Sequence, residues 1–238
     1  FNYRFLGKYI TASRFLDEAI HWTGLTRDTS RLIAALNEKA NVCYYSGDTV
    51  ASRRLHLEAL DLATKTNNRF AENYISHDLA ILFMAKKEYR RALDFFLINY
   101  QGCKDAGDPR QTVIAALNIA DAYQYLGGYD SSFHFLALTD SLTRRYQLNH
   151  ERVTLYKKLS DHYARQNKFR EAFQYITKYQ QLNDSIYNIR KERQISELTQ
   201  QFELNRKDQE HQLLKKQYRV TVIIATLVTV LVFFIIIL

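Results

Sequence analysis

The sequence is poor in the residues that end helices and cross-link chains. Its 238 residues include seven Gly, one Pro and two Cys. An all-β sandwich needs turn residues about every 8–12 positions, which so few Gly and Pro cannot supply. Two cysteines are too few for a disulfide-stapled scaffold. Because 47% of the residues are hydrophobic, with 17 Tyr and 14 Phe, a disordered chain is also excluded. The composition predicts an almost wholly helical protein.

The charge surplus is modest and spread along the chain. The formal net charge is +8, and no run of five or six like charges occurs. A polyanion-binding protein would concentrate its Lys and Arg in one patch or stripe. We therefore expect a solvated basic surface and no nucleic-acid site.

The last residues form the longest apolar run. Val220–Leu238 contains no charged residue, Gly or Pro, and as a helix it would extend about 28 Å, the thickness of a bilayer's hydrocarbon core. A buried core helix would carry its apolar residues on one stripe, whereas these cover every face. The run predicts a transmembrane helix over residues 220–238. Because the sequence starts at Phe1 and shows no signal peptide, we also expect it to be a piece of a longer protein.

A repeat of forty residues organises the first three quarters of the chain. Small residues recur at two positions per copy, and an aromatic follows the first of them by three residues in most copies. Such a pattern marks two antiparallel helices that cross closely, with aromatic side chains filling the wedge between them. The small residues are Ala40, Ala80, Ala120 and Ser160 at the first position and Ala12, Ser52, Ala92, Ser132 and Ala172 at the second.

Turn and cap residues keep the same register. Gly7, Gly47 and Gly127 fall between the two predicted helices, and Lys87 and Asn167 replace Gly in the other copies. Pro109, the only proline, falls at the first predicted helical position after Asp108. The residues that we expect to cap helix N-termini are Ser30, Asp48, Asp108 and Asn149.

The five copies resemble the tetratricopeptide repeat (TPR) family over about residues 4–183. The shared pattern is a small residue, an aromatic three residues on, Gly seven on, an aromatic nine on and Ala twelve on. The period of forty exceeds the usual length of about 34, and the pattern's last Ala is present only at Ala19 and Ala59. The resemblance implies an all-α solenoid of antiparallel helix pairs whose first copy lacks its first helix.

Residues 184–219 are mostly charged or amide and predict a juxtamembrane helical stalk. Ile195, Leu198 and Phe202 form a short stripe at coiled-coil spacing, but the next positions in that register are polar. A stable coiled coil needs three or four clean heptads. The stalk therefore has only a weak predicted tendency to form a homodimer.

No catalytic, cofactor or metal motif is present. The sequence lacks phosphate-binding Gly-rich loops and zinc-binding His pairs. His56 occupies a helix-crossing position and is predicted to be a core residue, as is Cys43, whereas Cys103 follows Gly102 near a predicted helix end and is expected to be exposed. We predict no enzyme activity, cofactor or metal for this chain. A kinase output domain beyond Leu238 stays open as an alternative.

The resemblance implies a concave surface lined by the first helix of each pair. Its mixture of tyrosines, amides and a few charges suits an extended peptide or a partner helix. The alternative is that the repeats only contact a neighbouring domain. The candidate partner-binding residues are Asn37, Asn41, Tyr44, Tyr45, His77, Met84, Asp121, Gln124, Tyr125, Lys157, Asp161 and Arg165.

The order of repeats, charged helix and membrane span resembles one-pass TPR regulators of the Bacteroidetes type. That resemblance implies a sensor domain outside the cytoplasmic membrane and a cytoplasmic output domain for signalling or transcription. Lys215, Lys216 and Arg219 precede the span, and the positive-inside rule would instead place the repeats in the cytosol. The alternative function is a membrane-anchored scaffold or assembly factor with no output domain.

Overall fold

The computed structural model describes the backbone of residues 3–237. It describes side chains over residues 8–219, except 190, 210, 213, 216 and 217. Within residues 3–237 the chain forms helices and no strand, which confirms the all-α prediction. The helices are α1 (Tyr3–Thr26), α2 (Thr29–Ser46), α3 (Thr49–Lys65), α4 (Arg69–Ala85), α5 (Tyr89–Asp105), α6 (Pro109–Tyr125), α7 (Tyr129–Arg145), α8 (Asn149–Arg165) and α9 (Phe169–Ile237).

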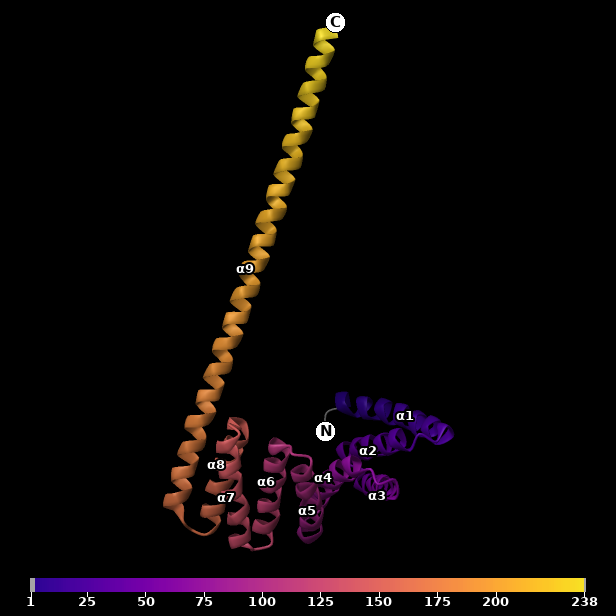
Figure 1. The fold of residues 1–238 in the computed structure, drawn as a ribbon, viewed down its shortest axis with the longest axis vertical. Coiled ribbons are helices and arrows are strands. Elements are labelled where there is room, and N and C mark those ends of the chain that lie inside the picture. Colours follow the sequence, from indigo (N-terminus) through magenta and orange to yellow (C-terminus); the bar gives the residue numbers. More distant parts are fainter. Residues whose placement is uncertain (1–2, 238) are drawn as a thin grey trace. The chain divides into compact units, whose positions relative to one another are not determined.

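The chain divides into two compact units, residues 1–182 and residues 183–238. In the first unit, each helix lies beside the next one in the sequence, as in a solenoid (Figure 1). We call α2, α4, α6 and α8 the first helices. We call α1, α3, α5, α7 and residues 169–182 of α9 the second helices. Neighbouring first helices also touch, α2 with α4 and α6 with α8.

Left-handed backbone positions recur every twenty residues. From α3 to α8 every helix has 17 residues and is joined to the next by three. Each of the eight connections between the described helices contains one residue with a positive φ, and three of these eight residues are Gly. The prediction that Lys87 and Asn167 replace a turn Gly is confirmed, with φ of 61° and 58°. The connections with positive φ lie at Arg27, Gly47, Asn67, Lys87, Gly107, Gly127, Gln147 and Asn167.

Two of the four predicted N-terminal caps are confirmed. Asp48 and Asp108 accept the backbone N–H three residues on, and Pro109 is the first residue of α6. Two predicted caps are wrong. Ser30 lies inside α2, whose cap is Asp28, and Asn149 is already the first residue of α8, behind Leu148. In both cases a left-handed residue, Arg27 or Gln147, directly precedes the cap and fixes its position.

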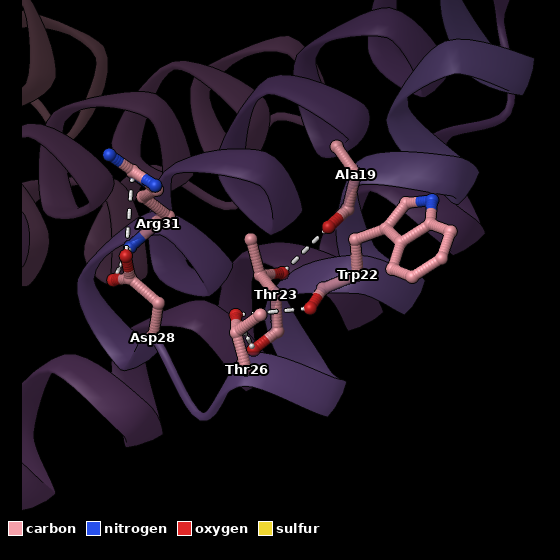
Figure 2. A network of polar contacts seen from close by, with 6 residues as sticks. All are labelled: Ala19, Trp22, Thr23, Thr26, Asp28 and Arg31. Carbon is pink, nitrogen blue, oxygen red and sulfur yellow. Dashed lines mark hydrogen bonds and ion pairs between the residues drawn. The ribbon is translucent and has the colours of Figure 1, made fainter.

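The connection between α1 and α2 shows how such a turn is closed (Figure 2). Thr23 and Thr26 donate their hydroxyls to the carbonyls of Ala19 and Trp22, at 2.8 and 3.1 Å, within the last turns of α1. Asp28 then accepts the backbone N–H of Arg31 at 3.1 Å. The side chains of Thr23 and Thr26 thus bond to backbone carbonyls at the end of α1, and that of Asp28 bonds to a backbone N–H at the start of α2.

The core follows the predicted crossing points. Ala40, Ala80 and Ala120 on the first helices are at most 1% exposed. Next to the crossings, a ring on the first helix stacks on a ring of the second helix in three successive pairs. These are Phe83 on Phe95, Tyr123 on Phe135 and Tyr163 on Tyr175, with centroids 5.6, 6.0 and 5.6 Å apart. The wedge between paired helices is filled by aromatic side chains, as expected.

Two further expectations are corrected. Gly7 lies within α1 rather than in a turn, because the helix already begins at Tyr3. Cys103 is 4% exposed rather than open to solvent, because α5 continues to Asp105 and turns this side chain inward.

The second unit is the rest of α9, whose backbone is helical as far as Ile237. Ile195, Leu198 and Phe202 are exposed there. No helix is long and apolar enough to cross a membrane in the part of the chain whose side chains are described. The predicted span, Val220–Leu238, lies outside that part.

Candidate partner-binding site

A pocket of about 310 Å³ lies between the first helices α6 and α8. We call it the α6–α8 pocket. The second half of α6 contributes one wall and α8 the other, so the pocket joins two copies of the repeat. It brings together all six candidate residues of these two copies. The lining residues are Asp121, Gln124, Tyr125, Thr154, Lys157, Lys158, Asp161 and Arg165.

The charges of the α6–α8 pocket are only partly neutralised. Lys158 donates to the carboxylate of Asp121, so these two charges compensate each other. Lys157 and Asp161 are exposed, and neither forms an ion pair with another described residue. The guanidinium of Arg165 lies over a tyrosine ring. The pocket therefore offers free groups of both signs to a polar ligand.

Tyr125 forms a rigid floor at the end of α6. Its ring stacks on that of Tyr89, from the start of α5, with centroids 4.7 Å apart and planes at 10°. The Arg165 guanidinium carbon lies 5.0 Å from the Tyr125 centroid, on the α8 side. Rings held by stacking and cation–π contacts lose little entropy on binding, so Tyr125 suits a contact surface.

Gln124 is the most unusual residue of the pocket. The residue as a whole is 7% exposed, and its side-chain amide has no hydrogen-bond partner among the described residues; the amide atoms are not enclosed, however, and reach the water-filled space of the pocket. An amide offers two donors and one acceptor, and at this place it can exchange its hydrogen bonds with water for hydrogen bonds with a polar ligand. The position of Gln124 on the pocket wall makes a polar ligand the natural partner.

The second and third copies use their amides differently. Asn37 is 3% exposed, and its Nδ2 donates to Asp78 Oδ2 at 2.9 Å, while Asn41 Nδ2 donates to the same oxygen at 3.1 Å. The acceptor Oδ1 of Asn37 lies 3.0 Å from His56 Nδ1, which therefore carries the ring proton. We call Asn37, Asn41, His56 and Asp78 the interior polar cluster. It joins α2, α3 and α4 and leaves Asn37 closed to a ligand.

The other candidates of these two copies do not line the α6–α8 pocket. Tyr45 is exposed, and its ring meets that of half-buried Tyr44 edge-on at 5.3 Å. His77 is half-buried, with its ring 6.2 Å from that of Phe96. Met84 packs against the core. The structure thus gathers the candidates of α6 and α8 and separates them from those of α2 and α4.

Sequence reasoning missed two lining residues, Thr154 and Lys158. The repeat register could have indicated Lys158, because Lys158 lies two periods of forty residues after Asp78. Asp78 also contacts the preceding first helix, through Asn41. A search for partners 37 residues apart would have paired Lys158 with Asp121.

Two buried histidines have altered acidity. Burial lowers the pKa of His56 to about 4, although the nearby Asp78 carboxylate opposes this change. It was predicted to be a core residue, and its 1% exposure confirms that. Burial, assisted by Lys168, also lowers the pKa of His162 on α8, whose ring lies near those of Tyr129 and Phe133. Among the described residues, no group of three His, Cys, Asp or Glu side chains could hold a metal ion.

Solved structures with the same architecture contain TPR-like repeats. The TPR-like repeats of a kinesin light chain from Podosopora anserina match 78% of this chain and 92% of theirs, with a TM-score of 0.66 and 15% identity. RapI in its apo form matches 77% of this chain with a TM-score of 0.65 and 20% identity, over 51% of its own length. MamA matches 78% of this chain and 94% of its own, with a TM-score of 0.58 and 13% identity.

These similarities define the class of fold, a TPR-like helical repeat, and confirm that part of the sequence-based interpretation. No protein-family model and no curated protein matches the chain by sequence. Because one fold serves many functions, the function must be argued from the site.

Proposed function

We propose that this chain is a non-catalytic module that binds a protein or peptide segment in the α6–α8 pocket. The observation that carries the proposal is the pocket itself, which joins two copies of the repeat and is lined by the Gln124 amide, without a hydrogen-bond partner among the described residues, and by the unpaired charges of Lys157 and Asp161. A peptide backbone supplies alternating N–H and C=O groups, which match the donors and acceptor of an amide side chain. Lys157 and Asp161 line the same pocket and would contact side chains of the bound segment.

The experiment is peptide selection followed by measured affinity. A random peptide library is panned against the immobilised chain, and each selected peptide is measured by fluorescence anisotropy. Gln124→Leu and Lys157→Glu should each weaken binding at least tenfold, since each removes a polar contact or reverses a charge (about 1.4 kcal/mol per tenfold). Arg90→Glu, an equal charge change at an exposed position of α5, should leave the affinity unchanged. Peptides that bind all variants equally would refute the site.

We extend the proposal to a membrane-anchored signalling or transcription regulator. Two observations support this extension. Val220–Leu238 is an uncharged run of the length that a bilayer requires, and the backbone of α9 stays helical from the last repeat to Ile237. In this proposal the protein crosses the cytoplasmic membrane once, with the repeats on the outer side. Binding in the repeats changes the pose of the stalk, and the stalk passes this to an output domain. A homodimer through Ile195, Leu198 and Phe202 belongs to the same proposal.

Insertions in the stalk test the transmission step in the full-length protein. Four residues inserted after Gln209 rotate the following helix by about 40° and should uncouple input from output. Seven inserted residues rotate it by only about 20° in the other sense and preserve the heptad face, so they serve as the matched control. An unchanged response with four inserted residues would refute the mechanism.

The second candidate function is a cytosolic membrane-anchored scaffold or assembly factor. The cationic residues Lys215 and Arg219 directly before the span favour it through the positive-inside rule. Alkaline phosphatase fused before Phe1 should be active if the repeats lie outside the membrane and inactive if they lie in the cytosol. A parent reading frame that continues for a hundred or more residues past Leu238 would favour the regulator over the scaffold.

A further inference from the structure

A ring fills the space between consecutive second helices at the later copies of the repeat. Phe83 on α4 lies between Arg53 of α3, whose guanidinium carbon is 5.4 Å from its centroid, and the stacked ring of Phe95 on α5. Tyr163 on α8 lies 6.2 Å from the ring of Phe133 on α7 and stacks in the same way on α9. Two side chains therefore occupy this space in each copy. One is the ring on the first helix, Phe83 or Tyr163, and the other is the residue opposite it on the preceding second helix, Arg53 or Phe133.

Both positions carry small residues in the second copy. Cys43 on α2 stands where Phe83 and Tyr163 stand, and Ser13 on α1 stands where Arg53 and Phe133 stand. An open pocket of about 400 Å³ lies at this place, and both residues line it. We call it the α1–α2 pocket. Its lining residues are Tyr9, Ile10, Ser13, Arg14, Asp17, Val42, Cys43, Ser46 and Asp48.

The α1–α2 pocket is large enough for one aromatic group. A cavity of about 150 Å³ holds benzene in an engineered protein interior, so about 400 Å³ leaves room for an indole. The wall is mainly apolar, through Ile10, Val42 and the ring of Tyr9, and the thiol of Cys43 behaves as a small apolar group because burial raises its pKa.

The rim of the pocket is polar. Asp48 uses one carboxylate oxygen to cap α3, and its other oxygen forms no hydrogen bond with a described residue. The hydroxyl of Ser46 donates to the carbonyl of Cys43 at 3.0 Å and can still accept a hydrogen bond. A ring that carries an N–H or O–H could therefore bury its body and direct its polar edge to this rim.

We propose that the α1–α2 pocket binds an aromatic side chain, tryptophan or tyrosine, of a partner polypeptide. The bound ring takes the place that Phe83 and Tyr163 take within their own copies, beside Ser13 of α1 and Cys43 of α2, with Asp48 before α3 also in the lining. Such single aromatic anchors in preformed pockets commonly dominate the affinity of an interface. This site is separate from the α6–α8 pocket and does not depend on the function proposed for it.

The test uses the wild-type chain and N-acetyl-tryptophanamide as the probe. Amide signals of Ser13, Cys43 and Ser46 should shift saturably in two-dimensional NMR spectra, and N-acetyl-leucinamide should shift them at least threefold less at equal concentration. The probe should also slow alkylation of Cys43 by iodoacetamide at least threefold, as measured by peptide mass spectrometry, with buried Cys103 as the internal reference. Absence of saturable shifts and of protection would overturn the proposal.

Cys43→Phe supplies the missing ring from within the chain. This variant should abolish binding of the probe, whereas Val50→Phe, which adds a ring at an exposed position of α3, should bind it as the wild type does. Equal binding by Cys43→Phe and wild type would place the probe elsewhere and overturn the proposal. The alkylation arm on the wild-type chain decides the question even where Cys43→Phe does not fold.

Discussion

Asp78 on α4 contacts Asn41 on α2 across the same 37-residue interval that separates Lys158 on α8 from its partner Asp121 on α6. The two pairs therefore occupy equivalent places at two junctions between first helices. One junction carries an amide and a carboxylate linked to the core, and the other an ion pair at the edge of a pocket. With the same backbone geometry, the junction of α2 and α4 is held by buried hydrogen bonds, whereas the junction of α6 and α8 contains a polar pocket.

Asp78→Ala should destabilise the first unit by about 2–3 kcal/mol. The change removes the acceptor for two amides, and Asn37 is too deeply buried to recover its hydrogen bond from water. Urea unfolding followed by circular dichroism measures the loss. Asp94→Ala, at an exposed position of α5, is the control and should change stability by less than about 0.5 kcal/mol. Equal effects would mean that the interior polar cluster contributes nothing.

The stability of the first unit should depend on pH through His56. Its folded pKa, about 4, lies below the ordinary histidine value of 6.5, because burial disfavours the charged ring. The unfolded chain therefore binds the proton more readily, and stability falls as pH drops below about 6.5 until it levels off below the folded pKa. We expect a loss of about 2–3 kcal/mol between pH 7 and pH 4.5.

Paired unfolding curves isolate this histidine. His56→Gln should reduce the pH dependence between pH 7 and pH 4.5 and leave the contribution of His162, whose pKa burial also lowers, while His134→Gln, at an exposed position of α7, should leave the wild-type curve unchanged. A wild-type slope that persists in His56→Gln would assign the effect to other groups.

Lys87→Gly should stabilise the protein by about 1 kcal/mol. Lys87 has a φ of 61° in the connection between α4 and α5, a conformation that costs a residue with a Cβ about 1 kcal/mol or more. Gly127→Ala provides the converse, because Gly127 has a φ of 77° at the equivalent place and Ala there should be destabilising by a similar amount. Thermal unfolding should move in opposite directions for the two variants.

The sequence predicted the parts of this fold that repeat. The small residues at Ala40, Ala80 and Ala120 located the crossings because five copies in register leave few other solutions. The roles of single polar residues were not predictable in the same way. Asn37 and Gln124 are both amide residues on first helices. The Asn37 side chain is hydrogen-bonded to His56 and Asp78, whereas the Gln124 side chain has no hydrogen-bond partner among the described residues.

That difference depends on which side chains the neighbouring helices present. Asn37 has an acceptor 41 residues further on, at Asp78, whereas the residue 41 further on from Gln124 is Arg165, which lies over Tyr125 instead. Cys103 illustrates the same limit, because Gly102 suggested a helix end that α5 does not have there.

Gly102→Ala should destabilise the protein, although Gly lies inside a helix. Ala is normally the better helix former by about 1 kcal/mol, but a Cβ at residue 102 would lie 2.7 Å from Cγ of Asn73 on α4. Asn73 cannot easily move aside, because its Oδ1 accepts a hydrogen bond from Nδ2 of Asn99 at 2.7 Å. We expect a net loss of about 1–3 kcal/mol, as for other substitutions that overpack a helix contact.

Gly24→Ala is the matched variant, since Gly24 lies within α1 and a Cβ there would meet nothing within 4 Å. At that position the substitution changes only the intrinsic helix propensity, so Gly24→Ala should stabilise the protein by up to about 1 kcal/mol. Urea unfolding of both variants under one set of conditions compares close packing with propensity directly. If Gly102→Ala were stabilising as well, α4 and α5 would have to be further apart than the Asn73 contact requires, and the close approach of these two helices would be refuted.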